Sequence, residues 1–291
     1  MKCMSTRCVS AALRRGLGCL TLLSLLVGGE SMALAAKQDE PAIVVKEESV
    51  TEAAKTVIED AGALLTLPTR MEGRDWLMVG GAAAVVGGLI AVDKPIQDWV
   101  DRNNKNSQGR KIADGFSAVG GAPGMAGVNI GVIGLGIANQ SLGGGSWIKE
   151  AGLIGLEAEA FAVAATAIIK EVSGRSRPEQ RQGATNFNPF SGGGSFGSVH
   201  AAASFAVASV YADRFDPAIG WLGYGFAAAV AASRVYTDKH FTSDVVLGSL
   251  IGWGMGKFIS RRHGADPTDW HIRPVALERG MGTGLMIGRA F

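Results

Sequence analysis

Cysteine is scarce in this 291-residue chain, and its placement excludes the chemistry that thiols support. The three cysteines, Cys3, Cys8 and Cys19, all lie in the first 35 residues, which have the pattern of a removable export signal. The rest of the chain therefore holds no thiol for a disulfide framework or a thiolate metal site.

Charge is also scarce, at 19% of residues, with a formal net charge of +2. The first 35 residues carry four basic residues and one acidic residue, so their removal would leave a formal charge of −1. A chain without a basic surface is not expected to bind nucleic acid. Hydrophobic residues reach 47%, enough for one large core in either a soluble or a membrane-embedded protein.

Residues 1–35 are interpreted as a signal peptide. A basic start precedes the apolar run Leu17–Val27, and Ala33-Leu34-Ala35 offers small residues for cleavage, which we place after Ala35. Neither the Arg14-Arg15 pair nor Cys19 has the surroundings of a twin-arginine or lipoprotein signal, so both alternatives are discounted.

The remaining chain is expected to be all-α. Residues 36–75 read as a linker and an amphipathic helix, which begins at the capping-box pattern Ser49-x-x-Glu52 and ends before Pro68. Residues 76–262 form one helical domain. Residues 263–291 form a tail with a short β-hairpin. Six apolar helices are expected in the domain, at about 76–92, 117–139, 151–170, 199–212, 217–233 and 243–259.

Three polar segments interrupt these apolar helices at their ends, namely 170–178, 195–200 and 233–244. Lys170, Arg177 and Arg234 supply fixed positive charge, and the hydroxyl of Ser198 is a further donor. The start of the helix at Val199 presents free N–H groups and a positive dipole end. Together these groups predict a site for a phosphate group.

Two histidines add reactivity to this anion site. Asp244 follows His240 by four residues, and we expect its carboxylate to accept the Nδ1 hydrogen and to leave Nε2 free to attack phosphorus. His200, at another helix end, is expected to protonate the leaving oxygen and then to activate water.

The order Lys-x6-Arg-Pro, Ser-x-His and Ser-Arg-x5-His-x3-Asp resembles the signature of the type-2 phosphatidic acid phosphatase (PAP2) and vanadium haloperoxidase superfamily. The motifs cover about residues 150–260, and the first and third match at every defining position. The second departs from the family's Pro-Ser-Gly-His, because this chain has Gly197-Ser198-Val199-His200. A side chain stands where glycine would let the phosphate approach the backbone, which predicts reduced activity or a reshaped pocket.

The resemblance implies a six-helix PAP2-like bundle and a metal-independent phosphatase without a cofactor. By this resemblance, His240 becomes a phosphohistidine, His200 is the general acid, and Asp244 is the carboxylate that supports them. The implied phosphate-binding residues are Lys170, Arg177, Ser198, Val199 and Arg234.

Several other conspicuous residues are expected to be structural. Glu157 and Glu159 interrupt an apolar helix and are expected to meet a polar neighbour or water, and His263 and His271 are expected to lie outside the catalytic site. Glycines 248, 252 and 256 recur every four residues, a spacing that permits close helix packing.

The apolar helices favour membrane association. A cleaved signal leaves the mature N-terminus outside, and six full spans would then place the site on the cytoplasmic side. In bacterial relatives that act on lipid phosphates, the active site usually faces outward. The signal is therefore uncleaved, some helices do not span, or the bundle is periplasmic. We expect an envelope protein, membrane-associated with an outward-facing site, and a soluble periplasmic form remains an alternative.

The expected substrates are phosphomonoesters or pyrophosphates of lipids, such as phosphatidic acid, phosphatidylglycerol phosphate, undecaprenyl pyrophosphate or lipid A. Two other functions stay open. A vanadate-dependent haloperoxidase would hold vanadate with the same residues, and a non-catalytic helical membrane protein could retain the anion pocket. The sequence does not distinguish the substrate or the oligomeric state.

Overall fold

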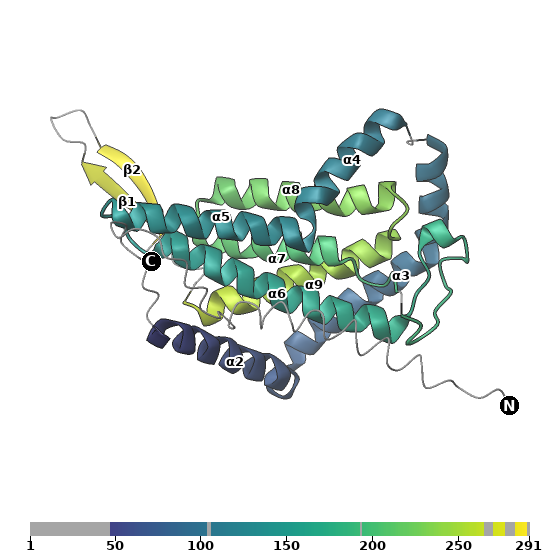
Figure 1. The fold of residues 1–291 in the computed structure, drawn as a ribbon, viewed down its shortest axis with the longest axis horizontal. Helices are drawn as coiled ribbons and strands as arrows, with labels where there is room; N and C mark the ends of the chain where they lie inside the picture. Colours follow the sequence, from purple (N-terminus) through teal and green to yellow (C-terminus); the bar gives the residue numbers. More distant parts are fainter. Residues whose placement is uncertain (1–46, 104–105, 193, 265–269, 277–282, 290–291) are drawn as a thin grey trace, which may run out of the picture. The chain divides into compact units, whose positions relative to one another are not determined.

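The computed structural model describes residues 47–103, 106–192, 194–264, 270–276 and 283–289. The predicted signal segment and its cysteines lie outside these residues. Residues 55–291 belong to one compact unit. The described residues form eight α-helices, one short 3₁₀ helix and two strands (Figure 1): α2 Glu47–Arg70, α3 Gly73–Asn103, α4 Ser107–Gly120, α5 Ala122–Ser141, α6 Trp147–Ser173, η1 Pro178–Gln180, α7 Val199–Arg214, α8 Pro217–Tyr236, α9 Thr242–Arg262, β1 Trp270–Ala276 and β2 Thr283–Arg289.

The predicted helical bundle is present, but the count of six helices is not confirmed. The polar stretch expected to be a loop after residue 92 is helical, because α3 continues to Asn103. It is followed by α4, whose first turn is capped where the Asn106 side chain accepts a hydrogen bond from the Gly109 amide at 2.7 Å. The expected helix at 117–139 is divided at Gly121, whose backbone is extended. Pro68 lies inside α2 rather than beyond its end.

Helix α7 lies at the centre of the bundle and contacts α4, α5, α6, α8 and α9. Its closest partner is α9, and the glycines predicted to allow close packing lie between these two helices. A Cβ atom added at Gly252 would come within 2.2 Å of the Ala202 carbonyl oxygen, and one added at Gly248 within 2.4 Å of the Ser198 carbonyl oxygen. Glycine is therefore required at these positions, and the close approach brings the start of α7 against the start of α9.

A buried polar cluster joins α5, α6 and α7. The Asn129 side chain donates a hydrogen bond to Glu159 at 2.9 Å and accepts one from the Tyr211 hydroxyl at 2.7 Å. Glu159 thus meets a polar neighbour, as predicted.

The described residues of the C-terminal segment form two antiparallel strands, at the place where the sequence predicts a hairpin. Trp270 of β1 pairs with Arg289 of β2, and Ala276 with Thr283. The connecting residues 277–282 lie outside the described residues.

Four described helices, α3, α5, α6 and α8, are long and apolar enough to cross a membrane. The most apolar window of α3 has a mean hydropathy of 1.8, yet only 6% of it is buried within the protein. An apolar helix that the protein itself does not cover fits a membrane protein.

Candidate active site

The predicted site residues lie at helix ends that meet at one end of the bundle. Lys170 is in the last turn of α6, Arg234 in the last turn of α8, and Arg177 precedes η1. Ser198 to His200 form the start of α7, and His240 lies two residues before α9. Helices α6 and α8 end where α7 and α9 begin, so the fold gathers residues that lie up to 70 positions apart in the chain.

His240 is 2% exposed, and its surroundings determine its tautomer. Its Nδ1 atom lies 2.9 Å from the backbone oxygen of Ser195. A carbonyl oxygen can only accept, so Nδ1 carries the hydrogen and Nε2 keeps its lone pair. Burial is the main cause that lowers the pKa of His240, to about 4, against the opposing effect of Asp244. The imidazole is accordingly neutral at pH 7, as a nucleophile must be.

Contrary to the prediction, Asp244 does not accept the Nδ1 hydrogen of His240. Its Oδ2 atom is 3.8 Å from Nδ1 and accepts instead from the Ser195 hydroxyl at 2.6 Å and from the Phe241 amide at 2.8 Å. The four-residue spacing places Asp244 in the first turn of α9, where its carboxylate closes a capping box, while the Ser195 carbonyl is the nearer acceptor. Asp244 therefore acts on the histidine through Ser195 and through its charge.

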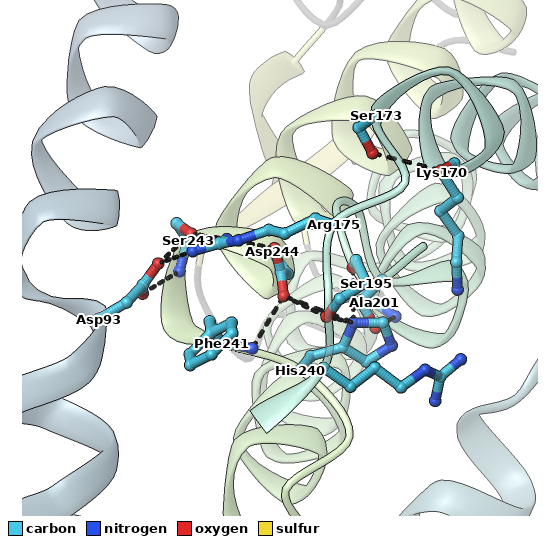
Figure 2. Close-up of polar contacts among 12 residues, drawn as sticks. Asp93, Lys170, Ser173, Arg175, Ser195, Ala201, His240, Phe241, Ser243 and Asp244 are labelled. Atoms are coloured by element: carbon cyan, nitrogen blue, oxygen red, sulfur yellow. Dashed lines mark hydrogen bonds and ion pairs between the residues drawn. The ribbon is translucent and has the colours of Figure 1, made fainter. Parts of the chain in front are cut away.

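Arg175 connects Asp244 to α3 (Figure 2). Its guanidinium is fully buried and reaches Asp244 Oδ1 at 2.6 Å and Asp93 Oδ2 at 2.8 Å. Asp93 also accepts from the Ser243 amide at 2.9 Å, so two carboxylates bind the first turn of α9. The Arg175 guanidinium lies over the Phe241 ring, with 4.6 Å between its central carbon and the ring centroid. This buried network holds the segment that carries His240.

Arg234 is held from α4. Its NH1 atom donates to the Ser117 hydroxyl at 3.0 Å, and Ser117 in turn lies 3.0 Å from the Ser233 hydroxyl. The Nε atom of Arg234 is buried and has no hydrogen-bond partner among the described residues. A buried guanidinium donor without a partner is costly unless a ligand accepts from it, and a phosphate oxygen would do so.

His200 lies in the same positive field. Burial is the main cause that lowers the pKa of His200 to about 4, with smaller contributions from the positive charges of Arg234, Lys170 and Arg177. All the predicted cations therefore act on one point beside α7. A dianionic phosphate would offset these charges and raise the pKa of His200, so substrate binding favours the protonated form that a general acid needs.

The turn at residues 197–200 differs from the family pattern in its backbone as well as in its sequence. Gly197 has φ of +83°, which proline, fixed near −65°, cannot adopt. Ser198 is fully buried, and its hydroxyl oxygen caps α7 by accepting from the Ala201 amide at 3.4 Å. Val199 is the first residue of α7, so its N–H lies at the free end of the helix. The turn thus keeps the helix-end donors while replacing the proline.

A pair at the rim flanks the cations. Lys239 donates to Glu179 at 2.6 Å, and this bond is the main cause that lowers the pKa of Glu179. Arg177 NH1 lies 3.9 Å from the same carboxylate.

In the described part of the chain, the group of histidine and carboxylate side chains close enough to hold a metal lies elsewhere, at Asp60, Glu157 and His263.

Sequence reasoning missed five residues of this site. Arg175 and Ser195 lie inside the motif segments. Their role depends on their complete burial, which the sequence does not show. Asp93 and Ser117 lie far outside the motifs, and only the fold brings them to α9 and α8. Glu179 follows Pro178 and carried no signal beyond its charge.

Residues 151–266 match the family model of the PAP2 superfamily, whose members are phosphatases. The matched region contains all three motifs, so the resemblance deduced from them is confirmed. No curated protein and no solved structure matches the chain.

Proposed function

We propose that this PAP2 superfamily domain is a metal-independent phosphatase that passes the phosphoryl group through His240 to water. The observation that carries the proposal is the state of His240, whose Nδ1 hydrogen is fixed by the Ser195 carbonyl at 2.9 Å. A neutral imidazole with its Nε2 lone pair free, in a field of three cations, is suited to attack phosphorus.

The reaction then has two balanced steps. Nε2 of His240 forms a bond to phosphorus while the bond to the leaving oxygen breaks, and protonated His200 gives that oxygen its proton. Water next attacks phosphorus, His200 takes a proton from it, and the P–N bond breaks to return the lone pair to His240. Lys170, Arg177, Arg234 and the helix-end amide of Val199 stabilise the negative charge throughout, with the Ser198 hydroxyl beside them.

The negative charge of Asp244 supports the intermediate. Phosphorylated His240 carries a positive ring, and the Asp244 carboxylate is 3.8 Å from Nδ1. Opposite charges at this distance in a buried site attract strongly, so the phosphohistidine is stabilised relative to the same ring in water.

Lipid phosphates are the proposed substrates. The exposed apolar length of α3 supports this proposal, because it suits contact with a bilayer, where such headgroups are presented. We further propose export to a bacterial envelope with the site facing outward. A cysteine introduced at exposed Ser191, in a chain whose other cysteines are replaced, should react in intact cells with a maleimide that cannot cross the inner membrane.

The test is phosphate release from a panel of lipid and soluble phosphates in EDTA. Wild type should be active, and His240→Ala should lose activity by at least about 1,000-fold, whereas His263→Ala, a matched histidine change at the other end of α9, should stay active. Wild-type turnover by His240→Ala would refute the mechanism. Inactivity of the wild type on every substrate, with anion binding intact, would favour a non-catalytic protein.

A further inference from the structure

A second polar cluster lies where α2, α6 and the end of α9 meet. His263 Nε2 is 2.9 Å from Asp60 Oδ2 and 3.2 Å from Glu157 Oε2. The three donor atoms lie within 4.8 Å of one another. Helix α9 has 21 residues between the two clusters, so this one is roughly 30 Å from the start of α9 and separate from the catalytic histidines.

The cluster requires a positive species between its donor atoms. An unprotonated Nε2 and two carboxylate oxygens at these distances would repel one another, because all three present lone pairs. A proton on Nε2 can serve one carboxylate well but not both. The cluster is therefore built around either a shared proton or a metal ion.

Glu157 favours a metal ion. Its side chain is only 10% exposed, and its Oε1 atom is buried with no hydrogen-bond partner among the described residues. A proton on His263 leaves that oxygen unsatisfied, at the cost of its desolvation. A metal ion bound by both oxygens of this carboxylate would remove the penalty.

Arg262 completes an outer layer. Its Nε atom donates to Asp60 Oδ1, the carboxylate oxygen that faces away from His263. This bond fixes the orientation of Asp60 and leaves Oδ2 for a ligand, as outer hydrogen bonds do in metal sites. The two carboxylates and Arg262 sum to −1, so a divalent cation leaves the cluster at +1.

We propose that Asp60, Glu157 and His263 bind a divalent transition-metal ion that fastens α2 to the bundle, away from catalysis. One imidazole and two carboxylates suit Zn²⁺ best among the common ions, with water at the remaining position. The site lies at the opposite end of α9 from His240, so phosphate release should not require it.

The test uses tag-free protein in detergent, stripped with a chelator, with Zn²⁺ as the probe. Calorimetry and elemental analysis should find one Zn²⁺ per chain, and Zn²⁺ at a hundred times Kd should raise the melting temperature by roughly 5–10 °C. The conservative variants Glu157→Gln and His263→Gln should weaken binding by at least about 100-fold.

Two matched controls should keep the wild-type affinity. Asp213→Asn changes another buried carboxylate, paired with Lys257 near the same end of α9, and His240→Ala removes a buried histidine at the other end. Absence of Zn²⁺ binding by wild type would overturn the proposal and leave a shared proton on His263. Unchanged binding by both Glu157→Gln and His263→Gln would also overturn it, because the ion would then lie elsewhere.

Discussion

Replacing Asp93 by asparagine tests whether the buried network on α3 serves catalysis. Asp93 makes an ion pair with Arg175 at 2.8 Å, and both side chains are fully buried. The substituted amide can still accept from the Ser243 amide, but it carries no charge and can turn an N–H donor toward the guanidinium. Removing one partner of a buried ion pair costs about 3–5 kcal/mol, and we expect about 3 kcal/mol here because Arg175 keeps Asp244.

That loss corresponds to a fall in melting temperature of roughly 6–12 °C. Phosphate release should show a fall in kcat of roughly 10- to 100-fold, since displacement of α9 by a fraction of an ångström misplaces His240. KM should change by less than about twofold, because Asp93 does not touch the phosphate-binding cations. Asp213→Asn is the matched control and should lose stability while keeping kcat. Wild-type kcat for Asp93→Asn, or a change confined to KM, would refute the reasoning.

Three further predictions concern the catalytic end. Ser195→Ala keeps the carbonyl that orients His240, so kcat should fall less than about tenfold; complete loss would show that the hydroxyl bridge to Asp244 dominates. Ser117→Ala removes a hydrogen bond that the charged guanidinium of Arg234 donates, worth about 1.5 kcal/mol, and should raise KM roughly tenfold with little effect on kcat. Histidine NMR should find His240 titrating near pH 4, because burial opposes its charged form; titration near its ordinary value of 6.5 in the ligand-free protein would contradict the buried neutral state.

Much of the fold could be predicted because its helices are apolar along most of their length and end at clear breaks. One exception was the polar stretch after residue 92. Charged residues there suggested a loop, but α3 continues through it and α4 follows, since a polar helix face is stable when the opposite face packs. The division at Gly121 could not be predicted, because one extended residue between two apolar helices does not change the apolar pattern of the sequence.

The candidate site could be located from the sequence, because each motif lies in a polar segment at the end of an apolar helix. The partner of His240 could not. The i, i+4 relation of His240 and Asp244 predicts contact only within a continuous helix, and α9 begins at Thr242, after His240. Once the helix starts between the two residues, Asp244 turns to cap it and the carbonyl of Ser195 takes the histidine hydrogen.

The role of Arg175 could not be predicted from the sequence either, because Arg175 and Arg177 carry the same charge in the same motif segment. The two arginines are two residues apart in an extended segment, where Arg175 forms an isolated bridge with Phe187. Arg175 is completely buried, while the Arg177 side chain is 30% exposed. Only a buried arginine with two carboxylates can hold the start of α9, and only an arginine left accessible can meet a phosphate. Charge alone does not distinguish the two arginines, whereas burial places Arg175 in the network that holds α9 and leaves Arg177 accessible.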